Sequence, residues 1–218
     1  MRTALRCTPV LVLSAVLLTG CNIPVSGSDA KPSGTAAPAP SGSAHALPVG
    51  AGPQTHYTVQ AQPAAGSCHY RYDHKEPLPD PVCTPGAVSP AVTQANLSTT
   101  ICRKGGYTSG IRPSAYITGK EKAANAKSYG YTGSFRDAEY DHLLSLQLGG
   151  DPNDYRNLWV EAPDPGHRTG AGPNNNKDKV ENRLHTAVCN HQVTLTAAQQ
   201  AIATDWTTAE TVLGISPQ

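Results

Sequence analysis

Hydrophobic and polar positions along the second half of the chain predict a strand, a turn, a second strand and a helix. Leu144, Leu146 and Leu148 alternate with polar residues, as in a strand with one buried face. The segment 149–154, Gly-Gly-Asp-Pro-Asn-Asp, consists of turn-forming residues, and an apolar run resumes over 157–160. We therefore expect the two strands to form a hairpin.

A helical period follows over residues 177–188. Apolar residues recur there at positions i, i+4, i+7 and i+8 and form one stripe, which consists of Val180, Leu184, Ala187 and Val188. Glu181 lies at the edge of this stripe, while Asp178 and His185 lie further round the helix. We expect Glu181 to be the acid of this helix that is half-buried against the hairpin.

The rest of the second half and the segments before it have weaker patterns. Residues 76–81 contain three prolines, which predict an extended and irregular backbone. Residues 91–102 predict a short helix and residues 116–129 a basic helix. Thr196 and Gln199 have the spacing of a capping box, and one continuous helix is expected from there to a stop at Gly214.

The first 60 residues differ in composition from the rest. Arg2 and Arg6 precede an apolar run at 10–18, which is shorter than the roughly 20 residues needed to span a membrane and is typical of a secretory signal. Cys21 follows small residues in a pattern that resembles a bacterial lipobox; a plain signal peptide with an incidental cysteine is the alternative. We expect a signal peptide at 1–20, a lipidated, disordered Ser/Gly/Ala/Pro-rich linker at 21–60 and a folded domain at 61–218. The protein is then exported and lipid-anchored to the outer face of the bacterial cell membrane.

Four cysteines remain in the expected mature domain: Cys68, Cys83, Cys102 and Cys189. An even number of cysteines in an exported protein predicts two disulfide bonds, and the sequence leaves their pairing open.

Charge is distributed unevenly, although the formal net charge of the whole chain is only +1. Residues 100–136 carry seven basic side chains and one acidic one, and residues 137–164 carry seven acidic side chains and one basic one. A basic arm beside an acidic pocket suits a polyanion held next to a bound cation. Two solvated faces of opposite sign explain the same charges equally well.

Three side chains of the expected hairpin suggest chemistry. Asp141 and His142 are adjacent on the first strand, and Asn157 enters the second. A carboxylate binds a hard cation, an imidazole takes a proton from water and an amide can fix the imidazole, which together are what a single-metal phosphodiesterase requires. Neighbouring residues of a regular strand point to opposite faces, so a site that uses both side chains requires a strand that ends or twists there.

These residues belong to a longer ordered constellation. It consists of Asp141-His142, Gly149-Gly150, Asn157-Leu158-Trp159 and Lys177-Asp178 with Glu181-Asn182. The constellation resembles the HNH (His-Asn-His, ββα-metal) endonucleases, in particular their bacterial secreted and lipoprotein members. The resemblance covers residues 80–210 and departs at Ser145 and Gln147, where family members commonly have proline and glutamate. It implies an α+β fold with a ββα-metal core, helical additions and a disordered N-terminal tether.

The resemblance also implies roles for individual residues. His142 is expected to act as the general base and Asn157 to orient its imidazole. Asp141 is expected to bind the metal together with a ligand from the helix, for which Glu181 is preferred over Asp178. Glu139 is a reserve ligand, and Asn174 is an alternative helix-side ligand.

The expected cofactor is a divalent metal, Mg²⁺ or Mn²⁺, because the predicted ligands are oxygen atoms. Lys177 and Arg183 are candidates for phosphate contacts. The expected function is endonuclease cleavage of DNA, and secondarily of RNA, with low sequence specificity. The alternative is a non-catalytic lipoprotein of the cell envelope that uses the same scaffold to bind a partner.

Overall fold

The central hairpin is shorter than the hydrophobic pattern predicted. In the computed structural model, which describes residues 46–216, it consists of the antiparallel strands β3 (Glu139–His142) and β4 (Leu158–Glu161). The first strand ends at His142, because the side chain of Asn157 binds both the N–H and the carbonyl of Leu144 and keeps them out of the strand ladder. Residues beyond it form the 3₁₀ helix η3 (Leu146–Leu148), and a second one, η4 (Tyr155–Asn157), leads into β4.

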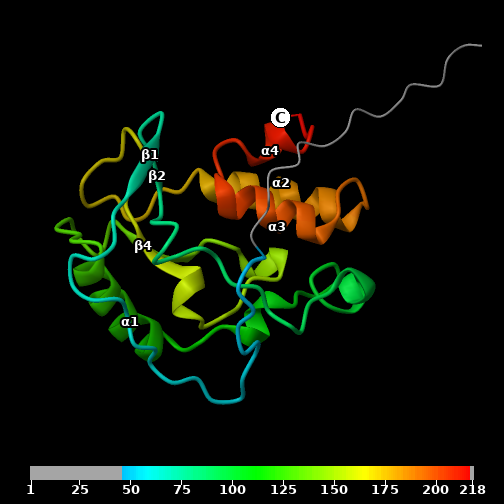
Figure 1. Ribbon diagram of the computed structural model, residues 1–218, viewed down its shortest axis with the longest axis horizontal. Helices are drawn as coiled ribbons and strands as arrows, with labels where there is room; N and C mark the ends of the chain where they lie inside the picture. Colours follow the sequence, from blue (N-terminus) through cyan, green and yellow to red (C-terminus); the bar gives the residue numbers. More distant parts are fainter. Residues whose placement is uncertain (1–45, 217–218) are drawn as a thin grey trace, which may run out of the picture. The chain divides into compact units, whose positions relative to one another are not determined.

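The helix α2 (Lys177–Cys189) follows the hairpin as predicted and packs on the helices α3 (Leu195–Thr204) and α4 (Ala209–Val212) (Figure 1). The prediction of one continuous C-terminal helix was wrong. The chain leaves the helix at Asp205, whose side chain accepts from the N–H of Thr207, and Trp206 turns inward to donate to the carbonyl of Pro77. The predicted capping box was also wrong: the N-cap of α3 is Thr194.

The predicted basic helix is confirmed as α1 (Ala115–Ser128), which packs against β4. Asn125 on its buried face accepts a hydrogen bond from the N–H of Val160 at 2.8 Å. Tyr129, at the end of α1, and Trp159 of β4 form a small core next to the Cys68 disulfide. A larger core lies between η3 and the C-terminal helices, and α2 and α3 contribute Val180, Leu184, Val188, Ala198 and Ile202 to it.

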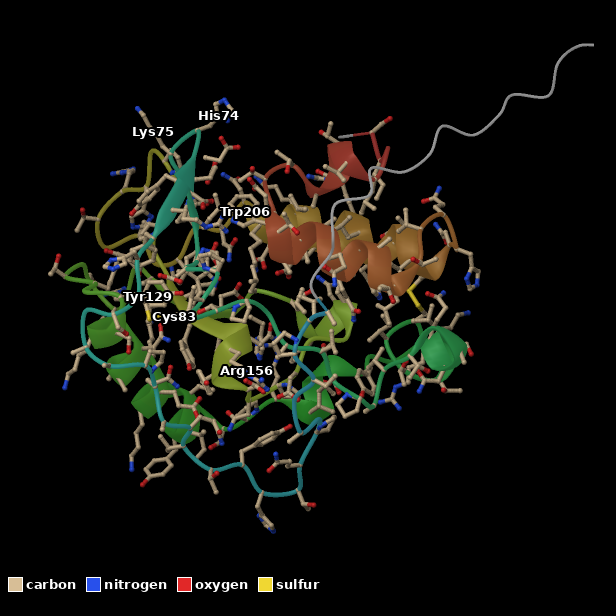
Figure 2. The ribbon with its side chains drawn as sticks, in the orientation of Figure 1. His74, Lys75, Cys83, Tyr129, Arg156 and Trp206 are labelled. Carbon is tan, nitrogen blue, oxygen red and sulfur yellow. A yellow bond between two sulfur atoms is a disulfide. The ribbon has the colours of Figure 1, made fainter. Side chains whose placement is uncertain are left out.

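A second antiparallel hairpin occupies the region that was expected to be irregular. It consists of β1 (Arg71–Asp73) and β2 (Glu76–Leu78). Figure 2 shows His74 and Lys75 at its tip, where their φ values of 47° and 72° produce the tight two-residue turn. Neither residue is a typical turn former, so no local pattern predicted this hairpin. The 3₁₀ helices η1 (Gln94–Thr99) and η2 (Thr108–Ile111) complete the structure, and η1 replaces the short helix predicted at 91–102.

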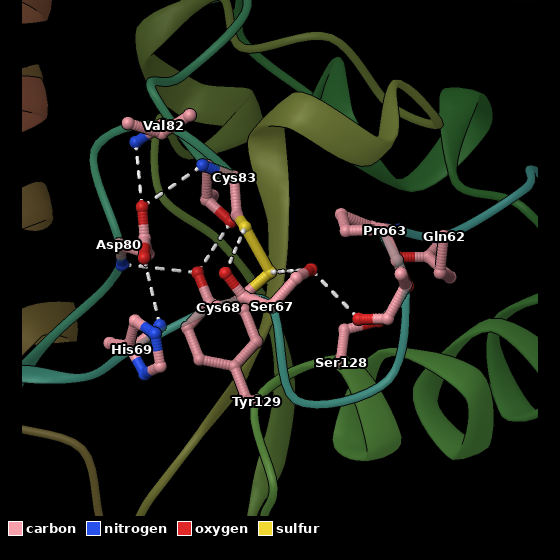
Figure 3. The surroundings of a disulfide bond; sticks show 12 residues. Gln62, Pro63, Ser67, Cys68, His69, Asp80, Val82, Cys83, Ser128 and Tyr129 are labelled. Atoms are coloured by element: carbon pink, nitrogen blue, oxygen red, sulfur yellow. Dashed lines mark hydrogen bonds between the residues drawn. A yellow bond between two sulfur atoms is a disulfide. The ribbon is translucent and has the colours of Figure 1, made fainter.

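Two disulfide bonds are present, as expected from the even number of cysteines. Cys68 pairs with Cys83, and the loop between them is closed further by Asp80, which accepts hydrogen bonds from three backbone N–H groups (Figure 3). Cys102 pairs with Cys189 and joins the end of α2 to the start of the basic segment.

The folded part begins earlier than the predicted boundary at residue 61. Gly50 donates its N–H to the carbonyl of Val88, and Gln60 donates its N–H to the carboxylate of Glu121 on α1. The expected signal peptide, the lipidation site at Cys21 and most of the expected linker lie outside the described residues. Within residues 46–216, no helix is long and apolar enough to cross a membrane. The described domain is therefore α+β, with two small sheets and several helices.

Candidate active site

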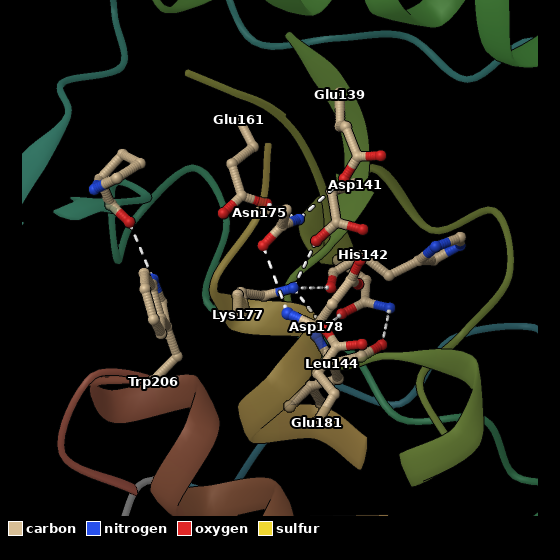
Figure 4. Close-up of polar contacts among 12 residues, drawn as sticks. Glu139, Asp141, His142, Leu144, Glu161, Asn175, Lys177, Asp178, Glu181 and Trp206 are labelled. Atoms are coloured by element: carbon tan, nitrogen blue, oxygen red, sulfur yellow. Dashed lines mark hydrogen bonds and ion pairs between the residues drawn. The ribbon is translucent and has the colours of Figure 1, made fainter. Parts of the chain in front are cut away.

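Three carboxylates gather on one face of the β3–β4 hairpin. Glu139 and Asp141 are two residues apart on β3 and share a face, and Glu161 lies directly opposite Glu139 on β4. One oxygen of each carboxylate lies within 4.8 Å of the others. From the loop before α2, the amide of Asn175 donates to Glu139 at 2.7 Å and to Glu161 at 3.1 Å (Figure 4).

The donors in this carboxylate group suit a hard divalent cation. Glu161 is only 3% exposed, and one of its buried oxygens has no hydrogen-bond donor among the described residues. Burial raises the pKa of Glu161 well above its usual value, and the nearby Asp141 carboxylate raises it further, against the opposing effect of Lys177. Burial likewise raises the pKa of Glu139. An added positive charge with a preference for oxygen ligands would relieve this repulsion.

Lys177 lies on the buried side of α2 and is 0% exposed. Its ammonium donates to the Asp141 carboxylate, to the carbonyl of His142 at 2.9 Å and to Glu181 at 2.5 Å. Burial alone would lower the pKa of Lys177, but the surrounding carboxylates outweigh burial and raise it well above its usual value. Lys177 is therefore a buried cation in the site, and its ammonium, predicted to contact substrate phosphate, is fully buried and bound by these three acceptors.

The two predicted helix ligands lie outside the carboxylate group. Glu181 is buried as expected, but it binds the Lys177 ammonium, and burial raises its pKa to about 7. Asp178 is exposed; burial and the charge of the nearby Asp141 raise its pKa, but it is not one of the three clustered carboxylates. Asp141 does belong to the group, and its pKa is lowered because the charge and hydrogen bond of Lys177 outweigh the effect of burial. The ligand set supported by geometry is thus Asp141 with Glu139 and Glu161.

His142 is held at the end of β3 with a defined tautomer. Its Nε2 lies 3.0 Å from the carbonyl oxygen of Pro152, which can only accept, so Nε2 carries the proton and Nδ1 has the free lone pair. The residue is 7% exposed, and burial lowers its pKa despite the opposing effects of Asp141 and the Pro152 carbonyl. His142 is therefore neutral at neutral pH and able to accept a proton.

Asn157 is fully buried, but its amide does not bind the imidazole. Its Oδ1 accepts from the N–H of Leu144 at 2.9 Å, and its Nδ2 donates to the carbonyls of Leu144 and Asp151, each at 3.0 Å. Asn157 thus fixes both ends of the 144–151 segment. It positions the imidazole indirectly, because the next residue after that segment is Pro152.

Arg183, the other candidate for a phosphate contact, forms a bidentate ion pair with Glu210 of α4, so its guanidinium already has a carboxylate partner. Arg112 is exposed, by contrast, and its positive charge lowers the pKa of both His142 and Asp178. Arg112 is thus an exposed basic side chain whose charge acts on the site, and sequence reasoning counted it only as part of the basic arm.

Sequence reasoning missed the roles of Glu161, Asn175 and Lys177. The hairpin register would have identified Glu161, because it is the partner of Glu139 once the strands are paired. The helical period would have identified Lys177, because residue 177 precedes Val180 by three positions and Leu184 by seven and so shares their stripe. Asn174 was considered as a ligand, but its neighbour Asn175 reaches the carboxylates, and no period in that loop distinguishes the two.

Comparison of the chain with protein-family models, with curated proteins and with solved structures finds no match.

Proposed function

We propose that this protein is a metal-dependent phosphodiesterase that cleaves DNA, and secondarily RNA, as an endonuclease of the HNH type. The observations that carry the proposal are His142, a buried neutral imidazole with a free Nδ1 that follows Asp141 on β3 and is influenced by its charge, and the three carboxylates gathered on the same hairpin. A base beside a candidate metal site is the minimum that hydrolysis by activated water requires.

Glu139, Asp141 and Glu161 would hold the divalent metal, Mg²⁺ or Mn²⁺. When bound, such an ion supplies positive charge where negative charge develops on the phosphate. Lys177 keeps Asp141 ionised and in place from the buried side of the cluster. The exposed guanidinium of Arg112 is available to a phosphate oxygen of the substrate.

His142 takes the proton from the attacking water at Nδ1. The Pro152 carbonyl holds the proton on Nε2 and thereby keeps the basic lone pair on the other nitrogen. Asn157 holds the segment that leads to Pro152, so its contribution to catalysis is positional. Low sequence specificity follows from the absence of a recognisable base-reading module in the sequence. The lipid anchor at Cys21 is a proposal that rests on the sequence alone.

The experiment that tests the function is cleavage of circular plasmid and of single-stranded RNA by residues 22–218, with Mg²⁺, Mn²⁺ or EDTA. We expect nicking that requires metal and that falls at least about 100-fold in Asp141→Asn, because this substitution removes a ligand charge. The matched control is Asp205→Asn, which lies at the break between α3 and α4 and should cleave normally. A folded wild-type protein that leaves both substrates intact with either metal would refute the proposal and favour a non-catalytic binding module.

A further inference from the structure

A second pair of carboxylates, Glu76 and Asp164, lies beside the start of α2. Both are fixed by Asn176, whose backbone N–H donates to Asp164 Oδ2 at 2.5 Å and whose side-chain amide donates to Glu76 Oε1 at 3.1 Å. Glu76 begins β2, and Figure 1 shows the loop that precedes α2 running next to this hairpin. Three separate segments of the chain therefore meet at this carboxylate pair.

Each carboxylate of the pair has one oxygen without a hydrogen-bond donor among the described residues. These two atoms, Glu76 Oε2 and Asp164 Oδ1, are both buried. The charge of Glu76 acts on Asp164, and Asp164 is only 2% exposed. Two buried carboxylates that one residue holds close together repel unless a proton or a cation lies between them.

A proton can fill this role only at low pH. Burial raises the pKa of Asp164 to about 6, with the Glu76 charge adding to the effect and the Asn176 N–H opposing it. Above that pH the Asp164 carboxylate is mainly ionised. The ammonium of Lys179 donates to Asn176 Oδ1 at 3.0 Å and does not bind Glu76 Oε2 or Asp164 Oδ1.

We propose that Glu76 and Asp164 form a second cation site, which binds a hard divalent cation, Ca²⁺ or Mg²⁺, through Glu76 Oε2 and Asp164 Oδ1. Both ligands are carboxylate oxygens, which such cations prefer, and the partial exposure of Glu76 lets water complete the coordination shell. Asn176 already holds both groups in place, so little ordering is needed on binding. The bound ion links β2, the loop before α2 and the start of α2.

This site would support the candidate active site without taking part in it. Asn175 and Lys177, the neighbours of Asn176, contact the hairpin carboxylates. An ion that fixes Asn176 therefore also fixes the segment that carries Asn175 and Lys177 into the candidate active site. The inference rests on Glu76, Asp164 and Asn176 alone and holds whether or not the protein is a nuclease.

The test uses thermal unfolding of the full chain at pH 7.5, first in EDTA and then with Ca²⁺ or Mg²⁺ alone. At a 100-fold excess over Kd, an ion that binds only the folded state should raise the Tm by about 5–10 °C. Glu76→Gln should lose the part of this rise that the second site contributes, while an ion held by the hairpin carboxylates still raises the Tm. Its amide oxygen keeps the Asn176 contact and its amide nitrogen donates to Asp164 Oδ1, so the variant should be at least as stable as wild type in EDTA.

A control variant and a binding measurement separate this site from the other buried carboxylates. Glu121→Gln changes another buried glutamate with an unpartnered oxygen, and it should keep the wild-type response to the cation. Titration calorimetry should show one bound ion fewer in Glu76→Gln than in wild type. Asp164→Asn provides a second test, because its amide can donate to Glu76 Oε2 in the same way.

The proposal is overturned if the Tm of Glu76→Gln and Asp164→Asn rises with the cation as much as that of wild type. It is also overturned if calorimetry finds equal numbers of bound ions in wild type and in both variants. Either result would mean that a shared proton, and no metal, holds the pair together.

Discussion

Replacing Lys177 by methionine tests the electrostatics of the site most severely. Methionine has nearly the same length and fits an apolar position, so Lys177→Met removes the charge and leaves most of the packing. The ammonium makes three hydrogen bonds, to Asp141, Glu181 and the carbonyl of His142. All of these are lost, and the buried carboxylates are left without their counter-charge.

The expected cost follows from the burial of these groups. Removing one partner of a buried ion pair costs about 3–5 kcal/mol, because the remaining charge is stranded away from water. We therefore expect Lys177→Met to lower the free energy of unfolding by about 3–5 kcal/mol in EDTA. In the double variant Lys177→Met/Glu181→Gln one stranded carboxylate becomes neutral, so the losses should be non-additive by about 1–3 kcal/mol.

The assay is urea denaturation followed by tryptophan fluorescence. Lys127→Met is the matched control: Lys127 is exposed on α1, and its substitution should change stability by no more than about 0.5 kcal/mol. A loss below about 1 kcal/mol for Lys177→Met would show that Lys177 is not the counter-charge of this cluster, and the account of the site would fail.

Three further predictions follow from the described contacts. Asn157→Ala leaves the N–H of Leu144 and two backbone carbonyls without partners, so urea denaturation should show a loss of about 3–5 kcal/mol; a loss near zero would contradict its role. Replacing Cys102 and Cys189 by alanine should cost about 4–5 kcal/mol in the same assay, and replacing Cys68 and Cys83 about 3 kcal/mol. The Cys102–Cys189 bond should contribute more because it spans 87 residues, whereas the Cys68–Cys83 bond spans 15. The reverse order of costs would refute the estimate. Burial raises the pKa of Glu121 to about 7, so the folded state holds this proton more tightly than the unfolded state and stability falls as the pH rises from about 4.5 through 7. The difference in free energy of unfolding between Glu121→Gln and wild type should therefore be about 2 kcal/mol more in favour of the variant at pH 8 than at pH 5. Equal pH dependence of the two proteins would refute this assignment.

The sequence predicted those parts of the fold whose signal is local. The helices at 115–128 and 177–189 follow from their spacing, and the even cysteine count predicted both disulfide bonds. The leucines at 144–148 were assigned to a strand because alternation is a local signal, whereas the strand actually ends through a tertiary contact with Asn157. Likewise, Trp206 fits the helical period of its segment, but its indole bonds to Pro77 across the fold and the helix ends before it.

The candidate site divides in the same way. Asp141, His142 and Asn157 were identified as a set, while the partners of each depended on register and burial. Glu161 became visible only through its pairing with Glu139, and Lys177 only because three acidic or carbonyl oxygens compensate its burial. A lysine among polar neighbours is ordinarily read as a surface residue, and that prior led to its assignment as a phosphate contact.

The central claim is that His142 is the general base of a phosphodiesterase, and the most direct test is the plasmid cleavage rate of His142→Ala with saturating Mg²⁺ or Mn²⁺. His69→Ala is the matched control, because His69 is an exposed histidine next to the Cys68–Cys83 disulfide. The account predicts that His142→Ala stays folded and loses at least about 100-fold in rate, as expected for a general base, while His69→Ala cleaves like wild type. Equal cleavage by His142→Ala and wild type would contradict the account.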